Sequence, residues 1–379
     1  MRKKVALLGS TGSVGQNACK VLAFHREKFE VKSLSANVNY KMLFHQAASL
    51  GVSDVVVVND LLAAQAELEA PEGLKVFRGI QGMVECACDP EVDIVLCAIL
   101  GSGALDVVLS ALRCGKTVAL ASKEVMLMAG KLVMETAGKY GGRIIPVDSE
   151  HSAIFQCIQA HDASSVKNLV LTCSGGPFRT FGAGELAEVS LKDALNHPVW
   201  SMGRKITVDS ASLMNKALEV VEAAYLFGID EKDIQVVVHP EGIIHSLVEF
   251  TDNSMVGLFS KPTMELPVQY ALSYPDMLPS EVDRLDLTAL GALHFEKVNS
   301  NFPSIDFARH ALQTGKNMPL VMNAANDTAV KKFCDGRISF TEIWKIIEKT
   351  MAKCSVCELD NIEDVRLADC EARRTAEEF

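Results

Sequence analysis

Lys4-Val5-Ala6-Leu7-Leu8-Gly9-Ser10-Thr11-Gly12-Ser13-Val14-Gly15 decides the fold of this chain. Its first five residues predict a short buried strand, and its glycines have a GxxGxxG spacing that permits a tight turn and a close approach of the backbone. A helix that begins at such a turn directs its free N–H groups at a bound pyrophosphate. We therefore expect a dinucleotide here, although a Gly-rich turn of another α/β fold remains the alternative.

The residues that follow alternate between strand and helix patterns up to about residue 145. Strands separated by helices imply right-handed crossovers and a parallel sheet covered on both faces. The apolar or β-branched runs that we expect to be strands are residues 31–36, 54–58, 93–98 and 117–121. The sequence thus predicts an α/β protein whose residues 1–146 form a Rossmann-like, NADP-binding domain.

The rest of the chain has a different rhythm. Strand patterns at residues 166–173 and 235–238 and a hairpin around residues 251–254 alternate with long helical stretches, including residues 210–227. This pattern predicts a central α+β catalytic domain. We expect it to cover residues 147–275, followed by a linker over residues 276–301 and a C-terminal helical bundle over residues 302–379.

Composition excludes several classes of function. The chain has 379 residues, 49% of them hydrophobic, and a formal net charge of −11, which argues against nucleic acid and anionic membranes as partners. No apolar run approaches the roughly 20 residues of a membrane span, and the apolar run at the start is too short for a signal peptide. Eleven cysteines, an odd number, suit reduced thiols, so we expect a cytoplasmic protein.

The end of the second expected strand, Leu34-Ser35-Ala36-Asn37-Val38-Asn39, bears on the choice of nucleotide. An NAD site usually has Asp or Glu here to bind the ribose hydroxyls. No acidic residue is present, and a carboxylate would repel the 2′-phosphate of NADP. The sequence therefore favours NADP, although no Arg or Lys occurs before Lys41.

Two carboxylates, Asp148 and Glu150, follow the apolar run Ile144-Ile145-Pro146-Val147. Ligands of α/β proteins gather where strands end, and hard divalent cations prefer carboxylate oxygens. If the segment is extended, the two side chains point to the same side. Alternatively, Ser149 caps a helix over residues 151–158, and the acids are ordinary first-turn residues.

A second group of charges, Lys216, Glu219 and Glu222, lies at three-residue spacing along one helical stripe. The carboxylates would suit a metal, and the ammonium would suit a phosphate ester. The alternative is an ordinary solvated Lys–Glu face.

Two loops complete the candidate site. Ser174-Gly175-Gly176 follows a strand and is either a phosphate-binding turn or a plain turn. Residues 197–205 combine His197 and Trp200 with cations and Gly203, which is typical of a lid, although Trp200 could equally be a buried anchor. We interpret His239 and His245 as structural residues.

Together these motifs resemble the 1-deoxy-D-xylulose 5-phosphate reductoisomerase family, over nearly the whole chain. The combination of Asp148-Ser149-Glu150-His151 with His197-Pro198-Val199-Trp200-Ser201-Met202-Gly203-Arg204-Lys205 is very specific. The other matching segments are residues 9–15, Ala121-Ser122-Lys123-Glu124, residues 174–179 and 208–222, and Asn323-Ala324-Ala325-Asn326. Val38 departs from a basic residue that is common in relatives, and Ser122 departs from a common Asn.

The resemblance implies the cofactors NADPH and Mg²⁺ or Mn²⁺, a sugar-phosphate substrate and a homodimer. The implied metal ligands are Asp148, Glu150 and Glu219, with Glu222 close by. The implied cofactor contacts are Thr11, Gly12, Ser13, Val14, Asn39, Glu124 and Gly203. The expected substrate-binding residues are Lys123, Ser149, Glu150, Ser174, His197, Trp200, Ser210, Asn215, Lys216 and Glu219. Lys123, Glu150 and His197 are the candidate catalytic residues.

In the expected reaction, the metal chelates the substrate, the carbon skeleton rearranges by retroaldol and aldol steps, and the nicotinamide donates hydride. A dehydrogenase of the semialdehyde type would share the first domain but need no divalent metal. A non-catalytic redox sensor would need neither the metal ligands nor the phosphate-binding residues. The four acidic side chains at positions 148, 150, 219 and 222 therefore favour the reductoisomerase.

Overall fold

The computed structural model describes residues 2–99, 101, 103–196, 200 and 202–379. The chain forms two compact units. The first unit comprises Met1–Val125, Val133–Ser152 and Thr263–Val282, and the second comprises Met126–Leu132, Ala153–Pro262 and Asp283–Phe379. The domain boundaries expected from the sequence divide the chain by function and not by compactness, so they remain a prediction.

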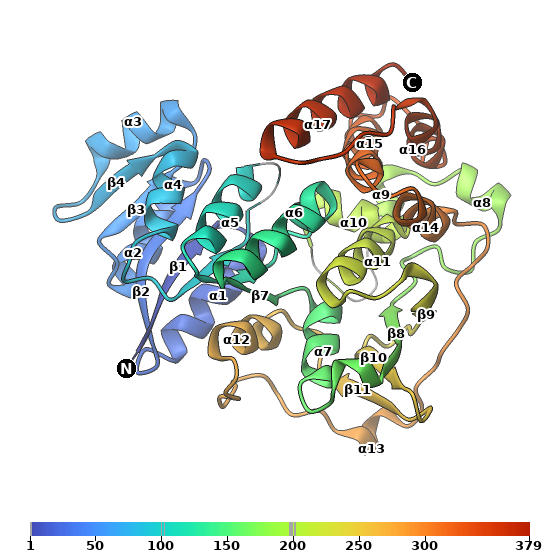
Figure 1. Ribbon diagram of the computed structural model, residues 1–379, viewed down its shortest axis with the longest axis horizontal. Coiled ribbons are helices and arrows are strands. Elements are labelled where there is room, and N and C mark those ends of the chain that lie inside the picture. The colour runs from blue at the N-terminus through green and yellow to red at the C-terminus, as the bar shows by residue number, and fades with distance from the viewer. Residues whose placement is uncertain (1, 100, 102, 197–199, 201) are drawn as a thin grey trace. The chain divides into compact units, whose positions relative to one another are not determined.

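A seven-stranded parallel sheet forms the centre of the first unit (Figure 1). The strand order is β4-β3-β2-β1-β5-β6-β7, so the direction of progression reverses where β1 lies between β2 and β5. Ligands of open α/β sheets bind beyond the carboxyl ends of the strands at such a reversal. The strands are β1 (Lys3–Leu8), β2 (Phe29–Ala36), β3 (Asp54–Val57), β4 (Lys75–Arg78), β5 (Ile94–Cys97), β6 (Thr117–Leu120) and β7 (Arg143–Pro146).

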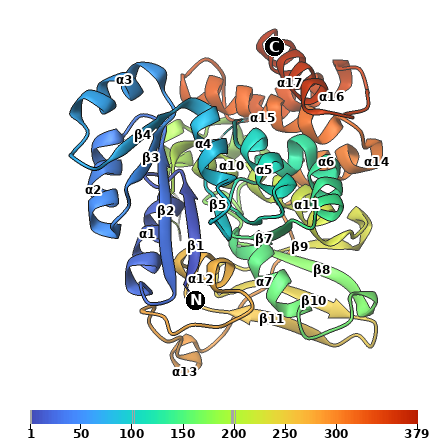
Figure 2. The same cartoon turned by 60° about the vertical axis from the view of Figure 1, so that its left-hand side comes forward.

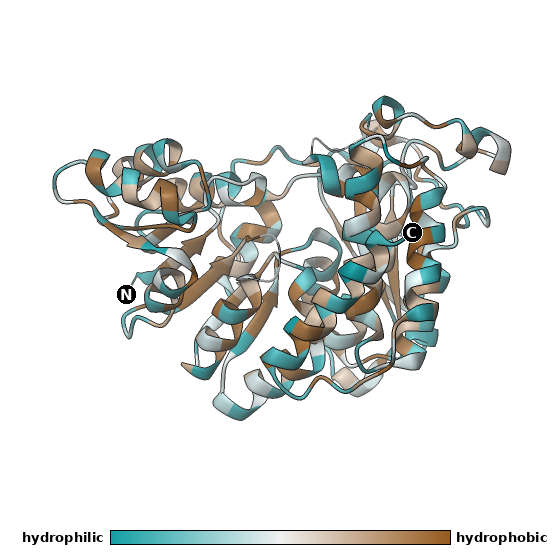
Figure 3. Cartoon of the chain, turned by 90° about the horizontal axis from the view of Figure 1, so that it is seen from above, coloured by the Kyte–Doolittle hydropathy of each residue, from teal (hydrophilic) through white to brown (hydrophobic). Residues whose placement is uncertain are grey.

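The central strand before the glycine turn is fully buried along its carboxyl-terminal part. Val5, Ala6, Leu7 and Leu8 are all 0% exposed, and full burial of one large aliphatic side chain contributes about 1.5–3 kcal/mol. The strands are largely brown in Figure 3, whereas the helices mix both colours. The helices of this unit are α1 (Ser13–Phe24), α2 (Tyr40–Leu50), α3 (Asp60–Glu69), α4 (Gly79–Ala87), α5 (Gly103–Arg113) and α12 (Glu265–Ser273).

The Rossmann-like parallel sheet is confirmed, and the five strands expected from the sequence are present within a few residues of their predicted ends. Strand β4 was not predicted, because its four residues Lys-Val-Phe-Arg lie at the sheet edge and none is buried. Two further helices, α6 (Glu124–Tyr140) and α7 (Ser149–Ile158), contribute residues to both units. Helix α6 is kinked at Ala129, where φ is −153° and ψ is 34°.

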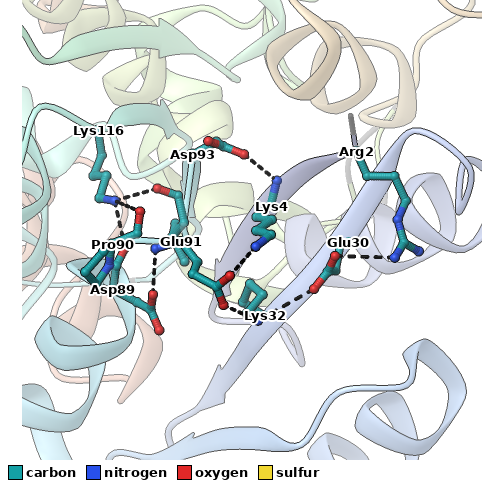
Figure 4. Close-up of polar contacts among 10 residues, drawn as sticks. Arg2, Lys4, Glu30, Lys32, Asp89, Pro90, Glu91, Asp93 and Lys116 are labelled. Atoms are coloured by element: carbon teal, nitrogen blue, oxygen red, sulfur yellow. Dashed lines mark hydrogen bonds and ion pairs between the residues drawn. The ribbon is translucent and has the colours of Figure 1, made fainter.

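The amino edge of this sheet carries a ladder of ion pairs (Figure 4). Glu91 pairs with Lys4 and, at 2.9 Å, with Lys32, while Arg2 pairs with Glu30 at 3.4 Å. Such solvent-accessible pairs contribute only about 0–1 kcal/mol each. A cavity of about 650 Å³ opens at this edge, but it lies opposite the carboxyl ends where α/β ligands bind. We therefore assign these charges to the framework.

The second unit contains a mixed sheet of order β11-β10-β8-β9 (Figure 2). Strands β8 (Val166–Cys173) and β9 (Ile234–Val238) are parallel, whereas β10 (Ile244–Phe250) runs antiparallel to β8 and to β11 (Met255–Phe259). The hairpin predicted around residues 251–254 is confirmed, and Asn253 adopts a φ of +66° in its turn. The α+β character of this part of the chain is therefore confirmed.

One helix prediction in the second unit is wrong. Residues 210–227 do not form one helix, because α10 (Arg204–Ala211) ends before α11 (Met214–Phe227) begins, and Leu213 between them has a φ of +58°. Ser210 therefore belongs to the last turn of α10. Gly228 follows α11 in the left-handed conformation, which is typical of a helix end. The other helices before the C-terminal region are α8 (Ala183–Ala187), α9 (Leu191–Ala194) and α13 (Leu287–Leu290).

The C-terminal region is helical, as predicted (Figure 1). Phe340 is fully buried and contacts Phe333, Trp344 and Phe178 edge-on, so these helices share a core with the turn after β8. Its helices are α14 (Ser304–Thr314), α15 (Met318–Cys334), α16 (Glu342–Lys353) and α17 (Ile362–Glu377). All eleven cysteines are free thiols, and no helix among the described residues is long and apolar enough to cross a bilayer.

Candidate functional site

The glycine turn lies at the reversal of strand order between β1 and β5. Gly9 has a φ of +86°, and a Cβ atom there would lie 2.3 Å from the carbonyl oxygen of Ala98. A Cβ atom on Gly15 would lie 2.1 Å from the carbonyl oxygen of Gly9. Both positions therefore require glycine for close packing. The turn itself stays accessible, because Gly12 and Ser13 are exposed at the start of α1.

A buried polar contact that sequence reasoning missed fixes this turn from behind. The Ser10 hydroxyl donates to Gln46 Oε1 at 2.7 Å, and Gln46 Nε2 donates back to the Ser10 carbonyl at 2.9 Å. Both residues are buried. Gln46 lies on α2, in a segment without any motif, so the only signal was its polar character on an otherwise apolar helix face.

The other predicted cofactor residues of the first unit occupy helix starts. Asn39 caps α2 by accepting a hydrogen bond from Met42 N at 3.2 Å, and Glu124 is the first residue of α6. Val38 is 54% exposed beside Asn39. An apolar side chain is therefore presented to solvent at the position where the sequence lacks a basic residue for a 2′-phosphate.

A buried ion pair joins Lys123 to Asp148 at the carboxyl edge of the sheet. Lys123 follows β6 and Asp148 follows β7, which are neighbouring parallel strands with Leu120 opposite Pro146. The Nζ to Oδ2 distance is 2.5 Å, and His151 Nδ1 lies 4.0 Å from the same Asp148 oxygen. The pairing follows from the topology, because the carboxyl ends of parallel strands meet at one edge of a sheet.

Helix α7 settles the local geometry of Asp148 and Glu150. The helix begins at Ser149, so Glu150 lies in its first turn and the extended alternative is wrong. The Asp148 carbonyl accepts from Ser152 N at 2.8 Å, and the Ser149 hydroxyl bonds to the Glu150 carboxylate. Carboxylates at a helix start are stabilised by the helix dipole. This position also leaves them beside the strand ends, where a cation could use them.

The charged stripe of α11 is buried, so the alternative of a solvated face is wrong. Lys216, Glu219 and Glu222 are 3%, 0% and 1% exposed. The two oxygens of Glu219 accept from Asn215 Nδ2, at 2.6 Å, and from the Lys216 ammonium. Buried charges are costly unless they are paired or bind a ligand, so this cluster is a functional candidate on physical grounds.

The turn after β8 lies against the end of α10. Gly175 and Gly176 have φ values of +79° and +68°, and Gly176 N donates to Ser174 Oγ at 3.3 Å. A Cβ atom on Gly176 would lie 2.9 Å from the Ser210 carbonyl oxygen. Ser174 and Ser210 thus come from segments in direct contact, and the phosphate-binding role of this turn stays a prediction.

The break between α10 and α11 is held by the C-terminal helices, which sequence reasoning missed. The Ser212 carbonyl accepts from Ser304 Oγ at 2.7 Å and from Trp344 Nε1 at 3.3 Å. Trp344 also donates to Ser304 Oγ at 3.0 Å. The left-handed Leu213 that follows is therefore fixed by tertiary contacts, and it separates Ser210 from Asn215.

The predicted lid is described only in part. His197 lies outside the described residues, whereas Trp200 is half-buried and Gly203 is the exposed N-cap of α10. The Gly203 carbonyl accepts from Thr207 Oγ1 at 2.8 Å, which anchors the start of the helix. The lid function of residues 197–205 stays a prediction.

The two histidines that we interpreted as structural have such contacts. His239 is 0% exposed, with Nδ1 2.8 Å from the His294 carbonyl oxygen and Nε2 accepting from Ile243 N at 3.2 Å. His245 Nε2 lies 2.8 Å from the Ser260 hydroxyl. Both rings join neighbouring segments of the second unit, which supports the structural interpretation.

Family models match three segments of the chain. Residues 5–130 match the 1-deoxy-D-xylulose 5-phosphate reductoisomerase model, and residues 144–227 and 259–375 match two C-terminal domain models of the same enzyme. Together these segments include nearly every motif discussed above.

Whole-chain comparisons agree. The 1-deoxy-D-xylulose 5-phosphate reductoisomerases of Geotalea uraniireducens and Bacillus cereus (strain Q1) are 45% and 44% identical, over 100% and 98% of this chain and 98% of each relative. The solved reductoisomerase from Zymomonas mobilis in complex with NADPH is 36% identical, with a TM-score of 0.94 over 99% of this chain and 98% of that one. A reductoisomerase in complex with NADPH, fosmidomycin and magnesium is 35% identical, with a TM-score of 0.92 over 99% and 98%. This chain belongs to the 1-deoxy-D-xylulose 5-phosphate reductoisomerase family.

Proposed function

We propose that this protein converts 1-deoxy-D-xylulose 5-phosphate to 2-C-methyl-D-erythritol 4-phosphate by isomerisation and reduction, using NADPH and a divalent metal. The observation that carries the proposal is the buried pair of Lys216 and Glu219, bonded to the half-buried Asn215, in a chain that matches reductoisomerases along its full length. A plain dehydrogenase would have no use for buried carboxylates and an ammonium on this helix.

The residues of the glycine turn fit a dinucleotide. Gly9 and Gly15 bring the backbone close, and the exposed start of the twelve-residue helix α1 can donate to a pyrophosphate. The reductoisomerase of Zymomonas mobilis, which has nearly the same fold, was solved with NADPH. NADPH bound here would supply the hydride. The residues that we propose to hold it are Thr11, Gly12, Ser13, Val14, Asn39, Glu124 and Gly203.

The carboxylates fit a hard divalent cation. We propose that Asp148, Glu150 and Glu219 share one Mg²⁺ or Mn²⁺. All three donate the oxygen ligands that such ions prefer, and all candidate metal-ligating groups among the described residues are drawn from the segments around residues 148–151 and 219–222. The cation would supply Lewis-acid polarisation of the substrate oxygens.

The remaining side chains bind and orient the substrate. Lys216 offers a point charge to the substrate phosphate, and Ser174, Ser210 and Asn215 offer hydroxyl and amide donors that orient it. This local charge is needed because the chain as a whole carries −11. Ser149, Trp200 and His197 complete the proposed substrate contacts. Binding the phosphate away from the reacting carbons fixes their orientation.

Proton transfer is proposed for three side chains. Lys123 is buried and its ammonium is held by Asp148, so its Nζ has a defined position at the carboxyl edge of the sheet. Glu150 is held by the Ser149 hydroxyl at the start of α7. His197 is the third candidate. Ammonium, carboxyl and imidazole groups are the side chains that most often move protons in enzymes.

We also propose a homodimer in the cytoplasm. Strand β11 is an edge strand, and Met255, Val256 and Phe259 on it are 50%, 37% and 46% exposed. An apolar edge strand invites pairing with a second chain. Size-exclusion chromatography with light scattering should give a dimer mass for the native chain and a monomer mass for Val256→Lys. A monomeric native chain would contradict the dimer.

A single assay tests the proposed reaction. The protein is incubated with NADPH, Mg²⁺ and 1-deoxy-D-xylulose 5-phosphate while the absorbance of the reduced nicotinamide is followed. We expect oxidation of NADPH only when all components are present, with loss of activity in a chelator and recovery on adding Mn²⁺. Undiminished turnover in the chelator would favour a dehydrogenase, and binding of NADPH without turnover would favour a sensor.

A further inference from the structure

We propose that Arg373, near the end of the last helix, positions Ser210 for the substrate phosphate through a chain of ion pairs. The inference rests on the proposed function, because Ser210 matters only if it meets the phosphate. It concerns helix α17, which none of the sequence motifs includes, and all of its residues lie in the second unit.

The ion pairs run without a gap from α17 to α10. Arg373 Nε lies 2.8 Å from Asp369 Oδ2, and its Nη2 lies 2.9 Å from Asp327 Oδ2. The other oxygen of Asp327 lies 3.0 Å from Lys205 Nζ, which is 2.8 Å from Asp209 Oδ2. Helix α10 packs against α15, and α15 packs against α17, so the charged chain follows the packing of the helices (Figure 1).

Asp209 is the residue of this ion-pair series that lies next to the proposed phosphate site. It is 1% exposed, and its Oδ1 accepts from Asn326 Nδ2 at 2.8 Å while its Oδ2 faces Lys205. Both oxygens therefore bond to groups of the framework. Ser210 follows directly in the chain, and its carbonyl is the atom that Gly176 approaches closely. Fixing Asp209 thus fixes the serine and the turn that contacts it.

Arg373 is the residue whose loss would disturb all of the ion pairs in this series. It contacts Asp369 through Nε and Asp327 through Nη2, an arrangement of two separate nitrogens that a lysine ammonium cannot reproduce. Without Arg373, Asp327 and Asp369 no longer share a cation. Lys205 would then be drawn toward Asp327 and away from Asp209. Burial alone would raise the pKa of Asp327, but the charges of Lys205 and Arg373 hold that pKa below its usual value.

The test compares Arg373→Met with Arg374→Met, which removes the same charge from an exposed position one residue along. We expect Arg373→Met to raise KM for the sugar phosphate about tenfold, as weakening of one hydrogen bond to a charged group would, with kcat within about twofold. Arg373→Lys should restore part of the loss. In a Ser210→Ala background, Arg373→Met should raise KM by a smaller factor than in the native chain, because one of the donors that it positions is gone.

A second readout does not depend on turnover. Amide hydrogen exchange should become faster in residues 204–211 of Arg373→Met and stay unchanged there in Arg374→Met. If the native protein turns over no substrate, the proposed function fails while exchange still decides whether Arg373 holds α10. Unchanged exchange in α10, or KM effects of Arg373→Met and Ser210→Ala that multiply, would overturn the inference. If Arg373→Met does not fold, Arg373→Lys with normal exchange and normal KM would overturn it equally.

Discussion

Gly176→Ala is the substitution whose effect the structure specifies most closely. Gly176 has a φ of +68°, and a side chain in the left-handed region costs about 1–2 kcal/mol. The new Cβ atom would also lie 2.9 Å from the Ser210 carbonyl oxygen. An ordinary C···O contact is about 3.3 Å or longer, so the turn and α10 must separate by about 0.4 Å or more.

This separation should act on substrate binding before it acts on chemistry. Ser174 and Ser210 are proposed to donate to the same phosphate, and a hydrogen bond to a charged group is worth about 1.5–3 kcal/mol. Loss of one such bond raises KM for the sugar phosphate about 10- to 150-fold. We expect kcat to change little, because Lys216 and Glu219 lie on α11, beyond the break at Leu213.

Steady-state kinetics with NADPH absorbance as the readout, together with thermal unfolding, measures both effects. The matched control is Gly184→Ala in α8, where a Cβ atom meets nothing within 4 Å and φ is not positive. Alanine is favoured there by about 1 kcal/mol, so stability should rise slightly and KM should not change. A Gly176→Ala protein with the KM and melting temperature of the native chain would refute the proposed contact between turn and phosphate.

Other predictions follow from the same structure. Gly12→Ala should fold normally, because its Cβ atom would lie 3.4 Å from the nearest atom, but should raise KM for NADPH about tenfold through the loss of one hydrogen bond to a charged group. Gly15→Ala should not fold to a soluble protein, because its Cβ atom would lie 2.1 Å from the Gly9 carbonyl oxygen. Circular dichroism distinguishes the two outcomes. Glu219→Gln should lower kcat/KM at least about 100-fold while fluorescence titration still shows NADPH binding, and near-native activity at trace metal would defeat the metal assignment. Asp327 has a lowered pKa, so its ion pairs stabilise the fold above the unfolded pKa of about 3.9 and lose this effect as the pH falls through the folded value. Asp327→Asn should therefore melt below the native chain at pH 7, with the difference vanishing in acid; an equal difference at both pH values would contradict the role of its charge.

The nucleotide turn could be predicted from sequence because its requirements are local. Gly9 and Gly15 are demanded by contacts within the turn and with the neighbouring strand, and the glycine spacing records them directly. Strand β4 could not be predicted, since a short edge strand with no buried residue leaves no hydrophobic pattern. A local sequence pattern is therefore sufficient to predict structure only where contacts within the segment determine the backbone conformation.

The candidate site depended more on distant contacts. Residues 210–227 have a continuous helical pattern, and the break at Leu213 is held by Ser304 and Trp344, which lie far along the chain. Spacing alone also left a solvated face open as an alternative for Lys216 and Glu219, whereas packing buries both. The sequence motifs thus indicated the segments of the candidate site, but the burial and the contacts of their side chains come from tertiary structure.

Manganese is the most direct probe of the central claim, because its anomalous scattering locates the ion without any assumption about activity. Crystals grown with Mn²⁺ should show one strong anomalous peak, with oxygens of Asp148, Glu150 and Glu219 all at about 2.1 Å from the ion. A peak bound by only one of the two acidic segments, or by neither, would contradict the proposal that these three carboxylates hold a single cation.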